Sequence, residues 1–113
     1  MIEANYIDNK EERTIRLQIT GHANTAPKGM DLLCAAVSTL LLTAVEIVEC
    51  MDLAKCFEVP PVIKMEEGDA EVFVISKEKN AVCTNNSLYT ILAGLLRLQR
   101  MYPENLRVDY HFI

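Results

Sequence analysis

The chain has 113 residues, and half of them are hydrophobic, which is enough to fill the core of one domain but not of two. Eleven Lys and Arg against sixteen Asp and Glu leave a formal net charge of −5 at pH 7. This balance and an aromatic content of 6% argue against nucleic-acid binding, which needs clustered positive charge, while a basic protein partner is compatible with them.

The first two predicted elements form a hairpin. Residues 1–7 favour a strand, and residues 8–12 form a polar turn. From residue 13 to residue 20, polar side chains alternate with the apolar Ile15, Leu17 and Ile19. A period of two over this length predicts a strand with one buried face, which ends at Gly21 and leads into a loop over Ala23 to Met30.

A long helix is predicted from Leu32 to about Leu53. Asp31 is its expected N-cap, because a carboxylate can accept hydrogen bonds from the free N–H groups of the first turn. Residues 32–45 are apolar on all sides, so we expect a sheet and either the second helix or a second subunit to cover them. These fourteen residues rise only about 21 Å, less than the ~30 Å hydrocarbon core, which favours a buried helix over a membrane span.

The second half of the chain begins with another predicted hairpin. Residues 62–66 and 70–76 flank a turn at residues 67–69 with Gly68 in its centre. Residues 72–75 are all apolar, which predicts a central strand covered on both faces. The acidic pair Glu66-Glu67 beside the turn is interpreted as solvated surface charge.

The last two predicted elements are a helix and a strand. Leu88, Ile91, Leu92, Leu95 and Leu96 recur at helical spacing, and the helix must end before Pro103. Residues 106–113 alternate as a final strand. The order β-β-α-β-β-α-β predicts an α+β fold, in which two helices lie on a mostly antiparallel five-stranded sheet and residues 1–113 form one domain.

The four cysteines, at positions 34, 50, 56 and 83, include no CxxC pair, so we expect no metal site. The opening residues MIEANYIDNKEER do not resemble a signal peptide. We therefore expect a cytoplasmic protein with free thiols. Cys50 and Cys56 are interpreted as packing residues at the helix end, and Cys83 as an exposed residue.

Cys34 is the candidate nucleophile. With Asp31 as N-cap, Cys34 is the third residue of the helix, where the partial positive charge of the helix start favours the thiolate. The free N–H groups there can also hold an oxyanion. Asp31 opposes both effects, because it occupies a donor and carries a negative charge. The alternative is that Cys34 is a small hydrophobic packing residue.

His22 is the candidate general base. It follows the second predicted strand and precedes the loop that returns the chain to the helix start. An imidazole in contact with the thiol can take its proton and later deliver that proton to a leaving amine. The alternative is a turn histidine that is hydrogen-bonded to the backbone.

The segment around these two residues resembles the signature of the bacterial ribosomal-processing cysteine protease family, Prp. It consists of Gly21-His22-Ala23, a short loop, and the run GMDLLCAAVS from residue 29 to residue 38. The order of the predicted elements and the late Tyr102-Pro103 are also similar to this family. The resemblance implies a small homodimeric α+β protein of the cytosol that removes the N-terminal extension of a large-subunit ribosomal protein.

The same resemblance implies that Cys34 is the nucleophile and His22 the general base of a dyad. The supporting residues that it implies are Asp31, Ser38, Gly21 and Gly29. The loop over residues 23–30 would act as a lid that orders on substrate binding. The expected activity needs no metal or organic cofactor, no membrane and no direct contact with nucleic acid.

Two alternatives to this peptidase hypothesis stay open. A non-catalytic ribosome-assembly factor would bind the same basic precursor, and its function would survive the substitution Cys34→Ser. A structural or dimerisation module would bury Cys34 as an inert core residue.

Overall fold

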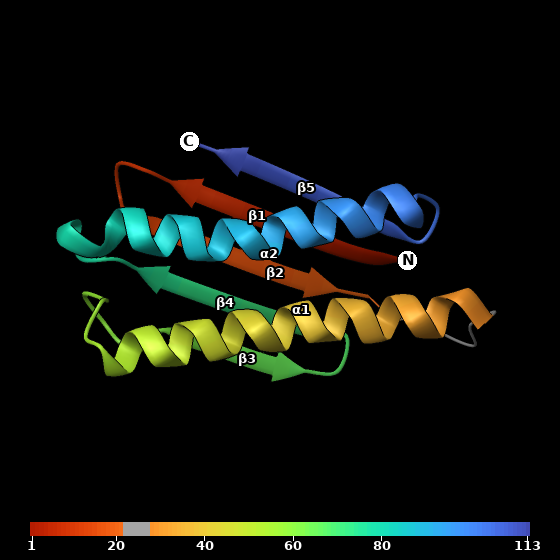
Figure 1. The fold of residues 1–113 in the computed structure, drawn as a ribbon, viewed down its shortest axis with the longest axis horizontal. Coiled ribbons are helices and arrows are strands. Elements are labelled where there is room, and N and C mark those ends of the chain that lie inside the picture. Colours follow the sequence, from red (N-terminus) through yellow and green to blue (C-terminus); the bar gives the residue numbers. More distant parts are fainter. Residues whose placement is uncertain (22–27) are drawn as a thin grey trace.

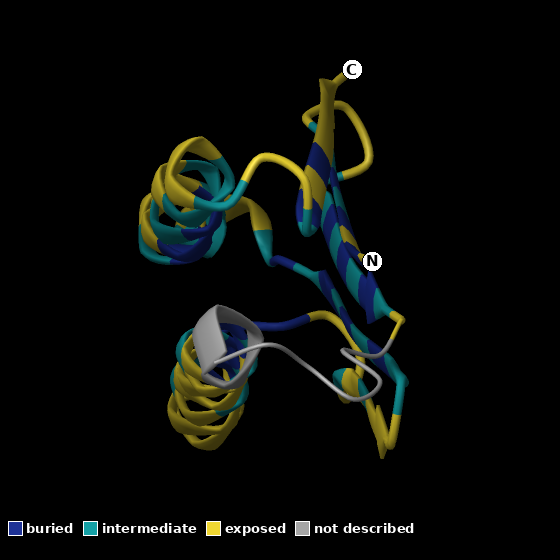
Figure 2. Ribbon diagram, turned by 90° about the vertical axis from the view of Figure 1, so that its right-hand side faces the viewer, coloured by how far each residue is buried: buried dark blue, intermediate teal, exposed yellow. Residues whose placement is uncertain are grey.

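The computed structural model describes residues 1–21 and 28–113, without the side chains of residues 28–31. Two helices lie side by side on one face of a five-stranded sheet, as Figures 1 and 2 show. This confirms the predicted α+β architecture and its order of elements. In chain order the elements are β1 (Ile2–Asn9), β2 (Thr14–Thr20), α1 (Lys28–Leu53), β3 (Val62–Glu66), β4 (Asp69–Ile75), a 3-10 helix (Glu78–Asn80), α2 (Ala81–Met101) and β5 (Leu106–Phe112).

The strand order across the sheet is β3-β4-β2-β1-β5. Three of the four strand pairs are antiparallel, and β5 pairs with β1 in parallel. In consequence the two hairpins lie side by side through β2 and β4, and α2 carries the chain from β4 to the opposite edge of the sheet. The sheet is mostly antiparallel, as the alternation in the sequence predicts.

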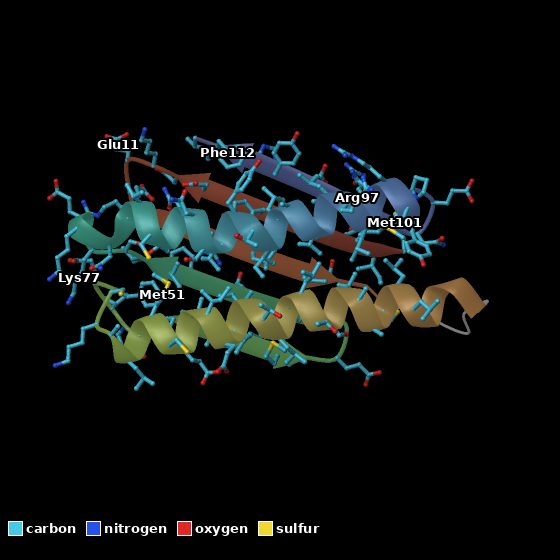
Figure 3. All side chains as sticks on the ribbon, in the orientation of Figure 1. Glu11, Met51, Lys77, Arg97, Met101 and Phe112 are labelled. Atoms are coloured by element: carbon cyan, nitrogen blue, oxygen red, sulfur yellow. The ribbon has the colours of Figure 1, made fainter. Side chains whose placement is uncertain are left out.

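The core lies between the helices and the sheet. Helix α1 buries a stripe at spacings of three and four residues: Leu33, Val37, Leu41, Ala44, Val48 and Met51. Figure 3 shows Met51 in the region between the C-terminal end of α1 and the start of α2. The helices run antiparallel and approach closely at Gly94, where an added Cβ would lie 2.8 Å from Cδ2 of Leu40.

Helix α1 begins at Lys28, four residues before the predicted start. Asp31 therefore lies inside the helix, and its predicted role as N-cap is wrong. The predicted loop over residues 23–30 is wrong for its last three residues, which are helical. The helix ends at Leu53, as predicted.

The apolar surface of α1 is covered on one side only. Leu32 and Leu42 are 67% and 57% exposed, so the sheet and α2 do not cover the helix all round. Of the two covers that we expected beside the sheet, the second helix leaves this face open, and a second subunit stays a prediction. By length and composition α1 is also apolar enough to cross a membrane, a property shared by core helices of soluble proteins. Its buried stripe against the sheet favours the core-helix interpretation.

The sheet face opposite the helices carries no other described element (Figure 2). The prediction that residues 72–75 are covered on both faces is therefore wrong. Phe73 on this face is half-buried, and the Arg16 guanidinium lies 4.3 Å from its ring centroid. Arg16 Nη1 and Gln18 Nε2 also donate to Oε1 of Glu71, at 2.5 and 2.8 Å. On this face, polar side chains of the neighbouring strand β2 therefore partly cover Phe73, and no second layer of described helices or strands does so.

Tyr6 allows a test of this core by pH. Its ring is buried, and its hydroxyl has no hydrogen-bond partner among the described residues. Burial first, and then the nearby Asp8 and Tyr89, raise the pKa of Tyr6 above its ordinary value. Above pH ~10 the unfolded chain loses this proton while the folded chain retains it, so rising pH destabilises the fold.

We expect the substitution Tyr6→Phe to remove this part of the alkaline instability. From pH 10 upward, the wild-type protein should lose up to about 1.4 kcal/mol more unfolding free energy per pH unit than Tyr6→Phe does. Urea unfolding at pH 8, 10 and 11 measures this difference, with Tyr110→Phe as the exposed control. Equal pH slopes for the wild type and Tyr6→Phe would contradict the expectation.

Candidate active site

A cavity of about 550 Å³ opens beside the N-terminal half of α1. It lies where β1 begins, where β2 ends and where β3 turns into β4, at the right-hand end of the molecule in Figure 1. Its lining is mostly apolar and comes from both layers of the fold: Ile2, Ile19, Val37, Leu41, Met65 and Ala70. A cavity of this size and character suits the side chains of an extended peptide.

Cys34 lines this cavity as a free, partly exposed thiol. It also packs partly against the hydrophobic core, so the side chain is held on the helix face that borders the cavity. Ser38 lies one turn further along α1 and lines the same cavity. The structure therefore places the predicted nucleophile and this supporting residue together, and the alternative of a buried, inert Cys34 is disfavoured.

The position of Cys34 along the helix differs from the prediction. It is the seventh residue of α1, in the second turn, rather than the third residue in the first turn. Helix-end charge acts mainly within the first turn, and only the first four N–H groups of a helix are free. The predicted activation of Cys34 by the helix start, and the oxyanion donors expected in its own turn, are therefore wrong.

Gly21 connects three parts of the cavity wall. Its N–H donates to the carbonyl of Gly68 in the β3–β4 turn, at 3.1 Å. Its φ of +102° lies in a region that side chains disfavour, and an added Cβ would overlap the carbonyl oxygen of Met1. Glycine is thus required at the position that directly precedes His22.

Several predicted site residues cannot be placed as side chains. His22 lies outside the described residues, as do residues 23–27 of the predicted lid. Gly29 and Asp31 belong to the first turn of α1 by their backbone, and the side chain of Asp31 lies outside the described part. The pairing of His22 with Cys34 and the closing of a lid stay predictions.

Sequence reasoning missed the acidic wall of the cavity. Glu66, Glu67 and Asp69 line it, although the sequence interpretation treated the Glu66-Glu67 pair as surface charge alone. The missed signal is topological: the turn of the second hairpin reaches the same end of the sheet as the end of β2. Only the register of β4 against β2 reveals this proximity.

The remaining cysteines are also free thiols. Cys56 is buried and Cys83 exposed, as predicted, whereas Cys50 is exposed and not a packing residue. Among the residues that the structure describes, no group of three or more His, Cys, Asp or Glu side chains is arranged to hold a metal ion.

Comparison with known families gives a match over nearly the whole chain. The family described as "Cysteine protease Prp" matches residues 1–107. This range includes every candidate site residue named above. A comparison with curated proteins finds no match.

Solved structures share the fold. The S. aureus ribosomal processing protease Prp in complex with a substrate peptide is 23% identical, with a TM-score of 0.72, 98% of this chain covered and 100% of that chain. The same protease with a covalently linked product peptide is 24% identical, with a TM-score of 0.69 and the same coverage. SMU.848 from Streptococcus mutans is 28% identical, with a TM-score of 0.74, 100% of this chain covered and 96% of that chain.

Proposed function

Because the chain belongs to the cysteine protease Prp family, we propose that it is an endopeptidase that removes the N-terminal extension from a precursor of a large-subunit ribosomal protein. The observation that carries this proposal is the partly exposed Cys34 thiol on the wall of a mostly apolar cavity. The net charge of −5 suits a basic substrate protein. The S. aureus relatives with a substrate peptide and with a covalently linked product peptide support a covalent route.

In this route Cys34 and His22 act as a dyad. His22 takes the proton from the Cys34 thiol, and Sγ attacks the scissile carbonyl carbon to form a C–S bond while the carbonyl oxygen becomes negative. The C–N bond then breaks, and His22 gives the proton to the leaving amine. Water, deprotonated by His22, hydrolyses the thioester and releases the extension with a free carboxylate, which regenerates the thiol.

The supporting residues have simple roles in this mechanism. Gly21 fixes the backbone from which His22 follows, because its N–H is anchored on the β3–β4 turn. Ser38 shapes the wall one turn from Cys34. We keep residues 23–27 as a proposed lid and assign no metal or cofactor to the reaction.

The test is cleavage of the ribosomal protein precursor that carries its N-terminal extension. Wild-type protein should shorten the precursor at one site, as measured by mass spectrometry of the products. His22→Ala should lower kcat/KM by about 10² to 10⁴-fold, the usual contribution of a general base, and Cys34→Ala should leave no measurable turnover. Equal cleavage by all three proteins would end the proposal.

We also propose that the protein is a cytoplasmic homodimer. The exposed apolar side chains of α1, Leu32 and Leu42 among them, support a covering subunit. Sedimentation equilibrium should give twice the chain mass of 12.7 kDa. Leu42→Asp should shift the protein toward the monomer if α1 forms the interface, whereas a wild-type protein that stays monomeric at 100 μM would contradict the dimer.

A further inference from the structure

Glu67 differs in its surroundings from the two acidic residues that flank the β3–β4 turn, Glu66 and Asp69. Alternation along the strands puts Glu66 and Asp69 on the uncovered sheet face together with Lys64, because Lys64 pairs across the strands with Glu71 and Glu66 pairs with Asp69. Lys64 Nζ lies 2.7 Å from Oδ2 of Asp69 and 3.8 Å from Oε2 of Glu66. These two carboxylates thus already share a cation.

Glu67 has no ion-pair partner among the described residues. It lies in the turn itself, between the two strands, and it lines the cavity that also holds Cys34. The described residues that line this cavity include no Lys, Arg or His. Glu67 therefore adds a negative charge to a wall whose described lining residues supply no cation.

The chemistry of the cavity favours an organic cation over a metal ion. The described residues contain no group of three or more ligating side chains that could hold a metal. Apolar side chains line the same cavity, among them Met65, Leu41 and Ala70. A Lys or Arg side chain fits this arrangement, since its methylene stem can lie on apolar surface while its charged end reaches a carboxylate.

We propose that Glu67 is a specificity-determining residue, which selects a Lys or Arg side chain of the substrate close to the scissile bond. The inference rests on the proposed peptidase function, because Cys34 defines where the scissile bond lies. Glu67 takes no part in the chemical step. Its effect is electrostatic recognition in the cavity, which also disfavours peptides that carry an acidic side chain at the same position.

The experiment measures peptide binding and peptide cleavage separately. Peptides that span the precursor's cleavage site are prepared with each Lys or Arg replaced in turn by norleucine. Their Kd values are measured on Cys34→Ser and on Cys34→Ser with Glu67→Gln, and their kcat/KM values on proteins with Cys34 intact. Glu11→Gln, at an exposed residue of the β1–β2 turn at the opposite end of the sheet (Figure 3), makes the same change in net charge and serves as the control.

One Lys or Arg position should account for the effect of Glu67. Glu67→Gln should weaken binding of the unmodified peptide about two- to fivefold and leave the peptide with norleucine at that position unchanged. Glu67→Lys should prefer a peptide with Glu at that position. Because Glu67 is exposed, the thermal midpoint should not move.

The subsite and the peptidase function fail in different ways. If Glu67→Gln weakens all peptides equally, or no more than Glu11→Gln does, the subsite is refuted even where cleavage is observed. If wild-type protein cuts no peptide, the peptidase proposal fails, while the binding data on the Cys34→Ser background still show whether Glu67 recognises a basic side chain.

Discussion

Cys34→Ser should bind the precursor with nearly wild-type affinity and cut it at least about 10⁴-fold more slowly. Serine keeps the shape of the cavity wall, but it is a poor nucleophile without a stronger base. The substitution therefore separates catalysis from binding. An assembly factor that only binds the precursor would retain its whole function in this variant.

The reactivity of the thiol provides a second measurement of the same prediction. Cys50 and Cys83 are exposed, so both are first replaced by serine, while the buried Cys56 is left in place as an internal control. In this background iodoacetamide at pH 7 should modify Cys34 faster in the folded protein than in urea. His22→Ala should remove the difference, because no helix-start effect is available in the second turn of α1.

Two results would contradict the catalytic role of Cys34. The first is modification of Cys34 only after denaturation, which would show an inert packing residue. The second concerns the protein in which Cys50 and Cys83 are replaced by serine. If adding Cys34→Ser to this protein leaves its rate of precursor cleavage unchanged, Cys34 is not the nucleophile. Either result would leave the cavity as a binding site without a nucleophile.

Gly21→Ala should lower the free energy of unfolding by at least about 2 kcal/mol. The added Cβ meets backbone rather than a flexible side chain, namely the carbonyl oxygen of Met1 and Cα of Ile2, and the φ of +102° is strained for alanine. Relief requires β1, β2 or the turn at Gly68 to move. The hydrogen bond from Gly21 to Gly68 should weaken, and the cavity should widen with it.

Gly94→Ala is the matched comparison for this prediction. The three atoms nearest to its added Cβ all belong to the flexible side chain of Leu40, and alanine is favoured over glycine in a helix by about 1 kcal/mol. We expect its unfolding free energy to stay within about 1 kcal/mol of wild type. Urea unfolding measures the free energy of unfolding of both variants. Equal stability of Gly21→Ala and wild type would contradict the prediction, because it would show that the backbone near Met1 moves aside without an energetic cost.

Much of the fold was predictable because its signals are local. The alternation at Ile15, Leu17 and Ile19 and the helical spacing from Leu88 to Leu96 each depend on neighbours in sequence, and both elements are confirmed. The start of α1 was not predictable in the same way. An Asp before an apolar run resembles an N-cap. In the structure Lys28, Gly29 and Met30 are also helical, so Asp31 lies inside the helix rather than at its start.

The candidate site, like the fold, was predictable only where its signals are local in the sequence. The spacing of Gly21, His22 and Cys34 and the resemblance around them indicated the nucleophile, and the family match over residues 1–107 agrees with that resemblance. The acidic wall could not be predicted, because Glu67 is 33 residues from Cys34 and only the pairing of β4 with β2 brings its turn to the cavity.

The amino-acid order by itself determined the order of the elements, the buried faces of β2 and α2 and the identity of the candidate thiol, since these follow from side-chain periodicity and local residue types. Only the tertiary structure decided how far Cys34 lies from the beginning of its helix and which charges share its cavity. The shared charges depend on the register of β4 against β2, which joins segments distant in the chain, and no local pattern carries that information.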